Sequence, residues 1–191
     1  MTLGIDSRTD WRWLAGTYWY VPTPDLPALR LAPDGETLSW RVDQTVWHLT
    51  GYENGYFWGS TAVVMGDPDD EEPGPIAQAI AARRGPQIGY RNLLGTVTPS
   101  GRVQITFTPT GRAPIEPTVG IGQMVQRAEV WAFEMQMSME QLRSRLLHWA
   151  TMIQTRPGEP SWDRLPGIDL SVPTMLADVS PPRFADADDD G

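Results

Sequence analysis

Arg41 and Asp43 are the charged side chains of this sequence whose setting best suits a ligand site. They lie in an alternating run, and Trp47 follows at the same parity, so an uninterrupted strand would turn all three side chains to one face. In an apolar cavity, an arginine can hold a ligand carboxylate with two parallel hydrogen bonds. The chemistry indicated is therefore anion binding beside an aromatic wall.

A β-bulge near Asp43-Gln44 is the competing interpretation of this run, and the apolar pattern favours it. One extra residue at that point would turn Arg41 and Asp43 outward. It would also return three apolar side chains to the core, namely Leu38, Trp40 and Val42. With the bulge the interior is a plain core, and without it Arg41 and Asp43 are the centre of a site.

Tyr18 and Tyr20 share one face of an earlier strand and carry hydroxyl groups that can donate hydrogen bonds. They could line the cavity or merely fill its wall. Together with Arg41 they are the candidate catalytic residues if the protein is an enzyme. Glu134 is expected to face outward, because Trp131 and Phe133 compete for the inside.

The element that must position these residues is a β-hairpin from Thr37 to Met65. Two alternating runs flank Asn54-Gly55, which is the strongest short-range signal of a two-residue hairpin turn. Such a turn places Glu53 opposite Tyr56. The inner face is then predicted to carry Trp47, Leu49, Tyr56, Trp58, Ala62 and Val64. Of these, Trp47, Tyr56 and Trp58 join Arg41 and Asp43 as predicted ligand-binding residues, whereas His48 falls on the outer face, where we expect a structural role.

The rest of the chain supplies partners for this hairpin. Further strands are predicted at residues 14–21, 29–32, 92–98, 102–109 and 129–139. A short helix is expected near 75–84 and a C-terminal helix at about 139–154, followed by an extended arm over 155–185 and a disordered acidic tail over 186–191. We expect one mostly β domain over 1–191, with an up-and-down antiparallel barrel of about eight strands and its helix over 14–154, because closure removes exposed edges.

Composition excludes several kinds of function. The chain has no cysteine, and its 15 basic residues are all arginine, which rules out thiolate sites, Schiff-base lysines and a P-loop lysine. The net charge of −9 arises from two acidic runs, and no basic stripe suits nucleic acid. We therefore predict a cytoplasmic protein with no cofactor, no metal site, and neither a nucleic-acid nor a membrane partner.

The first strand resembles the opening Gly-x-Trp strand of lipocalin-like, or calycin, and avidin-like barrels, although Trp19 falls one residue late. Within that group, Tyr18-x-Tyr20 and Asp43-x-Thr45-Val46 are similar to phenolic acid decarboxylases. That resemblance implies a catalytic Tyr-x-Tyr pair with an arginine and a glutamate deeper in the cavity. Only the two tyrosines carry over, because the segment expected to supply the arginine reads Gly55-Tyr56-Phe57-Trp58.

The function expected from these features is binding of a small apolar or aromatic ligand, which can carry a carboxylate, in the barrel cavity. A lyase or isomerase that needs no cofactor is the alternative. A third interpretation is a filled structural barrel that forms a homodimer through surface aromatic side chains.

Overall fold

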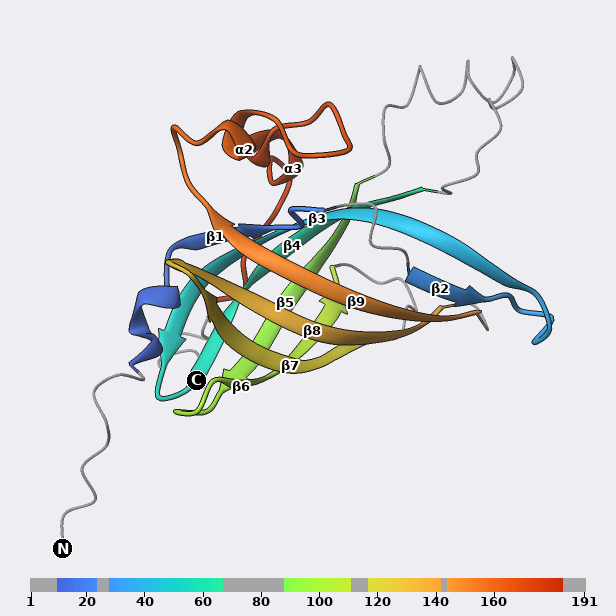
Figure 1. Ribbon diagram of the computed structural model, residues 1–191, viewed down its shortest axis with the longest axis horizontal. Helices are drawn as coiled ribbons and strands as arrows, with labels where there is room; N and C mark the ends of the chain where they lie inside the picture. Colours follow the sequence, from blue (N-terminus) through green and yellow to red (C-terminus); the bar gives the residue numbers. More distant parts are fainter. Residues whose placement is uncertain (1–9, 24–27, 67–87, 111–116, 142–143, 184–191) are drawn as a thin grey trace, which may run out of the picture.

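The computed structural model describes residues 10–23, 28–66, 88–110, 117–141 and 144–183. Within these residues, a single antiparallel sheet closes into a barrel with eight strand positions, as predicted (Figure 1). Its strands are β1 (Thr17–Tyr20), β2 (Ala28–Leu31), β3 (Leu38–Glu53), β4 (Tyr56–Gly66), β5 (Gly89–Val97), β6 (Arg102–Pro109), β7 (Thr118–Arg127), β8 (Val130–Gln141) and β9 (Ser144–Thr155). From β3 to β9 each strand pairs with the next along the chain.

The first strand position is divided between β1 and β2, which both lie between β3 and β9. Tyr20 pairs with Val46 and Ala28 pairs with Arg41, so four residues of β3 have no partner strand on this side within the described chain. The side chain of Gln44 fills part of this gap: its amide accepts from Val21 N–H at 3.2 Å and donates to Val21 C=O at 3.0 Å. A side-chain amide thus replaces a missing strand partner.

The β3–β4 hairpin turns at Asn54-Gly55, as predicted, with φ angles of 49° and 87°. Glu53 pairs with Tyr56 and Gly51 with Trp58, but Leu49 then pairs with Gly59, so Thr50 is an extra residue. This β-bulge exchanges the two faces of the hairpin beyond it. Without the bulge, the predicted pairing of Glu53 with Tyr56 would continue to Trp47 opposite Ala62; instead, Trp47 pairs with Thr61.

The barrel interior is filled at one end. The 3-10 helix η2 (Trp11–Leu14) lies there, and its buried Trp11 donates an indole N–H to Thr98 C=O at 3.0 Å. Behind it the large buried side chains include Trp19, Trp47, Phe57, Phe107 and Phe133. Trp47 and Phe107 mark the far limit of this aromatic core.

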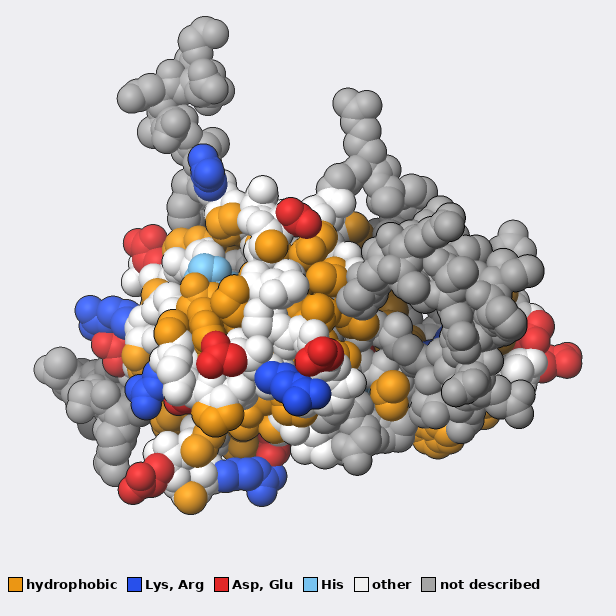
Figure 2. Space-filling view, turned by 90° about the horizontal axis from the view of Figure 1, so that it is seen from above, with side chains coloured by type: hydrophobic (Ala, Val, Ile, Leu, Met, Phe, Trp, Pro, Cys, Tyr) orange, Lys and Arg blue, Asp and Glu red, His pale blue; other side chains and the backbone are white. Residues whose placement is uncertain are grey.

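A second core lies on the outside of the barrel, under the C-terminal arm. Short helices α2 (Pro160–Asp163) and α3 (Val172–Met175) lie over β1 and β3 (Figure 1). The buried side chains of this outer core are Tyr20, Val46, Ala62, Leu165, Val172 and Met175. Seen from the side of the arm, hydrophobic side chains are interspersed with charged ones of both signs (Figure 2). Because the arm covers this part of the wall, β1, β3 and β4 are apolar on both faces.

The predicted helix at about 139–154 is wrong: β8 extends to Gln141, and residues Ser144–Thr155 form the strand β9. Leu146, Ala150 and Met152 alternate inward, and β9 pairs with β8 on one side and with β1 and β2 on the other. β9 closes the barrel, and its backbone is paired along both edges. This pairing stabilises a strand more than the helical spacing of Leu146, Trp149 and Ile153 would stabilise a helix.

The predicted helix near 75–84 and the acidic tail at 186–191 lie outside the described residues. Glu134 faces outward as expected and forms an ion pair with Arg127. No helix in the described ranges combines the length and the apolar character needed to cross a bilayer.

Candidate ligand-binding cavity

A cavity begins in the barrel interior where the aromatic core ends. Its volume is about 80 Å³, taken as the space that the centre of a water molecule can occupy. Its apolar wall includes Trp47, Val63, Phe107, Met137, Met139 and Met152. Its polar lining consists of Asp43, Thr45, Thr61, Arg91, Thr118 and His148. Apolar walls with a few placed polar groups are typical of small-molecule sites.

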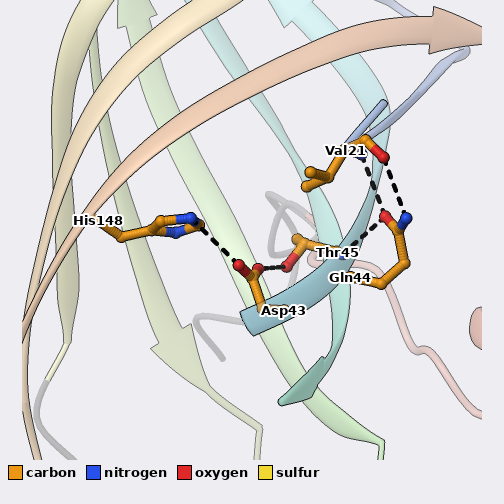
Figure 3. Close-up of polar contacts among 5 residues, drawn as sticks. All are labelled: Val21, Asp43, Gln44, Thr45 and His148. Atoms are coloured by element: carbon orange, nitrogen blue, oxygen red, sulfur yellow. Dashed lines mark hydrogen bonds and ion pairs between the residues drawn. The ribbon is translucent and has the colours of Figure 1, made fainter. Parts of the chain in front are cut away.

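Asp43, on β3, and His148, on β9, approach each other across the divided first strand position (Figure 3). The Asp43 Oδ1 atom lies 3.2 Å from His148 Nε2, and the two side chains are only 8% and 9% exposed. The other carboxylate oxygen, Oδ2, accepts a hydrogen bond from the Thr45 hydroxyl at 2.6 Å. A buried carboxylate needs such partners, because desolvation without them is costly.

The division of the first strand position explains why these two side chains can meet. β3 and β9 are separated by that position, and Asp43 and His148 lie at the level where β1 has ended and β2 has not begun. A continuous strand would place its own inward side chain between them. The interruption therefore creates the acid–imidazole pair.

Arg91, on β5, supplies the cationic group of the cavity. Its guanidinium donates to Thr118 Oγ1 at 2.5 Å and contacts Met139 Sδ at 3.3 Å. Among the described residues no carboxylate lies within ion-pair distance of it. Burial lowers the pKa of Arg91 from its ordinary value, but an arginine stays protonated at neutral pH. The cavity thus contains a positive charge whose neighbours are a hydroxyl and a thioether.

Thr61 lies directly opposite Arg91 in the β4–β5 pairing and also lines the cavity. It is 2% exposed, and its hydroxyl has no hydrogen-bond partner. A buried hydroxyl without a partner carries a desolvation cost that a bound polar group would remove. Arg91 and Thr61 together therefore offer a cation and a hydroxyl donor to an anionic group.

Of the predicted ligand-binding residues, Asp43 and Trp47 line the cavity. The predicted bulge at Asp43-Gln44 is absent, since β3 pairs with β4 without a break from Val42 to Leu49. Leu38 and Trp40 are consequently 61% and 52% exposed. Arg41 shares the parity of Asp43 and pairs with buried Ala28, but it does not line the cavity.

Tyr18 and Tyr20, predicted as catalytic candidates, lie on the outer face of β1 beneath the C-terminal arm. The Tyr18 ring stacks on His48, with centroids 4.2 Å apart, and meets Trp162 edge-on at 4.9 Å. The structure therefore does not bring these tyrosines to the cavity or to Arg41. His48 has the structural setting expected of it.

Tyr56 and Trp58 are also turned away from the interior, because of the bulge at Thr50. Tyr56 is 62% exposed, and Phe57 occupies the core in its place. The indole of Trp58 covers the backbone of Gly51 on the outer surface. The prediction that these two aromatic side chains face inward is wrong.

The sequence reasoning did not identify Arg91, His148 or Thr61 as site residues. His148 was not recognised because its segment was predicted to be a helix. In a strand, His148 lies on the same inward face as Leu146 and Met152. Arg91 precedes buried Leu93 by two residues, so it shares that inward parity.

In comparisons with known proteins, no family model, no curated protein and no solved structure matches this chain. The assignment of a function therefore depends on the cavity itself.

Proposed function

We propose that this protein binds a small organic carboxylate, with the carboxylate at Arg91 and the apolar body of the ligand against Trp47, Phe107 and the methionines. The observation that carries the proposal is the setting of Arg91, a half-buried cation without a carboxylate partner among the described residues. An anion at this point would accept hydrogen bonds from the guanidinium and from the free hydroxyl of Thr61.

The volume of the cavity limits the ligand. The cavity volume of about 80 Å³ is small beside the roughly 300–1,000 Å³ of pockets that hold drug-sized ligands. The ligand expected is thus a short aliphatic or branched acid. The barrel is compatible with the lipocalin-like architecture that its first strand resembles, and a binding role suits such a barrel. A cytoplasmic location remains part of the proposal.

The test is calorimetric or NMR titration with butyrate and with butyramide, which has the same shape but no charge. Butyrate should bind about 10–100 times more tightly, since a hydrogen bond to a charged group contributes about 1.5–3 kcal/mol. Arg91→Gln should remove this preference. Arg102→Gln, at an exposed position on β6, is the matched control and should retain it. Equal binding of the acid and the amide, or unchanged butyrate binding by Arg91→Gln, would refute the proposal.

A further inference from the structure

The cavity contains a second polar group with unused bonding capacity. Asp43 Oδ1 is fully buried and makes no hydrogen bond, although His148 Nε2 lies 3.2 Å away. The two observations are consistent because a short distance is not sufficient: the ring N–H must also point at the acceptor. The contact between Asp43 Oδ1 and His148 Nε2 is therefore close, but its geometry is not that of a hydrogen bond.

Hydrogen bonds hold Asp43 and the residue next to it in place. Its Oδ2 is held by the hydroxyl of Thr45, and the neighbouring Gln44 ties β3 to Val21 and, at 2.9 Å, to Pro166 C=O. The carboxylate is thus fixed with one oxygen satisfied and one available. Since a buried acceptor without a donor costs free energy, this second oxygen is suited to a donor that arrives with the ligand.

We propose that Asp43 and His148 form a second subsite that binds a hydroxyl group, so that the ligand is a small hydroxy acid. This inference rests on the proposed carboxylate site at Arg91, which would hold the other end of the same molecule. A hydroxyl can donate to Asp43 Oδ1 and accept from the imidazole N–H at once. An ammonium group can only donate, so it would leave the imidazole N–H without an acceptor.

A metal ion is a poorer occupant of the same place. Protein metal sites generally have three or four side-chain ligands, whereas Asp43 and His148 are joined by no third acidic, imidazole or thiol side chain in the described part of the chain. Thr45 and Thr61 supply only hydroxyl groups. The local chemistry is that of hydrogen bonding to a neutral polar group.

The experiment compares butyrate with 2-, 3- and 4-hydroxybutyrate and with 4-aminobutyrate, by NMR titration of the full chain. At least one hydroxybutyrate should bind about tenfold or more tightly than butyrate, because the added hydrogen bond is to a charged acceptor. In Asp43→Leu this preference should fall to less than about threefold, because the charged acceptor is gone. His148→Phe should weaken the same preference in part. Ser39→Ala, near the start of β3, is the matched control and should leave it unchanged.

Two results would overturn the hydroxyl subsite. One is butyrate binding at least as tightly as every hydroxybutyrate, and the other is 4-aminobutyrate binding more tightly than all of them. If Asp43→Leu does not fold, as shown by circular dichroism, the comparison of ligands on the unaltered protein decides alone. A separate pair, 1,3-butanediol and 1-butanol, lacks the carboxylate; a preference for the diol would support the subsite even if the Arg91 proposal fails.

Discussion

Replacing Arg91 with methionine should stabilise the unliganded protein while abolishing ligand binding. The guanidinium is half-buried among Thr118, Met139 and apolar side chains, with no carboxylate to compensate its charge within the described residues. A charge in such a place has lost hydration without gaining a counter-ion. Methionine matches the long, unbranched stem and removes the charge.

The magnitude follows from two opposed contributions. Apolar replacement of buried ionic groups is neutral or stabilising by about 1–4 kcal/mol. Against this, Thr118 loses its donor, at a cost of about 1 kcal/mol, and the guanidinium retains part of its hydration. We expect a net gain of about 1–2 kcal/mol in the free energy of unfolding. For a domain of this size that raises Tm by about 2–8 °C.

The assay is urea unfolding followed by tryptophan fluorescence, without ligand and with butyrate at 100 times its dissociation constant. Ligand should add about 2.7 kcal/mol to the unaltered protein and nothing to Arg91→Met. Arg102→Met is exposed and should stay within about 0.5 kcal/mol of the original. If Arg91→Met loses more than about 1 kcal/mol, the hydrogen bonds of Arg91 are structural and the reasoning is refuted.

Three further predictions concern the scaffold. Gly95→Ala should cost about 1–3 kcal/mol in urea unfolding, because the new Cβ would overlap the ring of buried Phe57; an unchanged midpoint would contradict this packing. Gly55→Ala should cost about 1–2 kcal/mol, since φ is 87° there, and amide exchange at the hairpin tip should quicken. Burial lowers the pKa of His48 below its unfolded value, so the unfolded chain binds the proton more readily. The free energy of unfolding should therefore fall as the pH drops below about 6.5, and His48→Gln should flatten that slope if His48 is its source.

Turn chemistry made much of the barrel predictable. Asn54-Gly55, Gly35 and Gly101 all adopt the positive φ angles that their turns require. These signals are local, because a residue's backbone preference does not depend on the distant chain. Turn residues at these three places predict the β2–β3, β3–β4 and β5–β6 hairpins and hence the barrel class.

The faces of the central hairpin were less predictable. The bulge at Thr50 lies beside Gly51 and Gly59, and a Cβ on Gly59 would collide with the backbone carbonyl of His48. Glycine inside a strand is a known sign of a bulge or of close backbone approach. On this rule, Gly51 and Gly59 predict a bulge that lies closer to the hairpin turn than Asp43-Gln44 does.

β7 and β9 escaped prediction for different reasons. Gly120 and Gly122 of β7 face inward, where the side chains of Met135 and Met137 occupy the space, so the sequence there looks like a loop. β9 is apolar on both faces, with Trp149 65% exposed, and so fits helical and strand periods equally. The contact between Asp43, on β3, and His148, on β9, joins two distant parts of the chain, which is why local sequence patterns did not reveal it.

The divided first strand position also has a kinetic consequence. The strands from β3 to β9 form between neighbours in the chain, whereas β1 and β2 must pair with β9 from the opposite end of the sequence. Contacts between distant segments require the largest loop closure and are expected to form late in folding. The seam between β3 and β9 should thus be the last part of the barrel to close and the first to open. Asp43 and His148 face each other across this seam, so the cavity that they line is complete only once folding is complete.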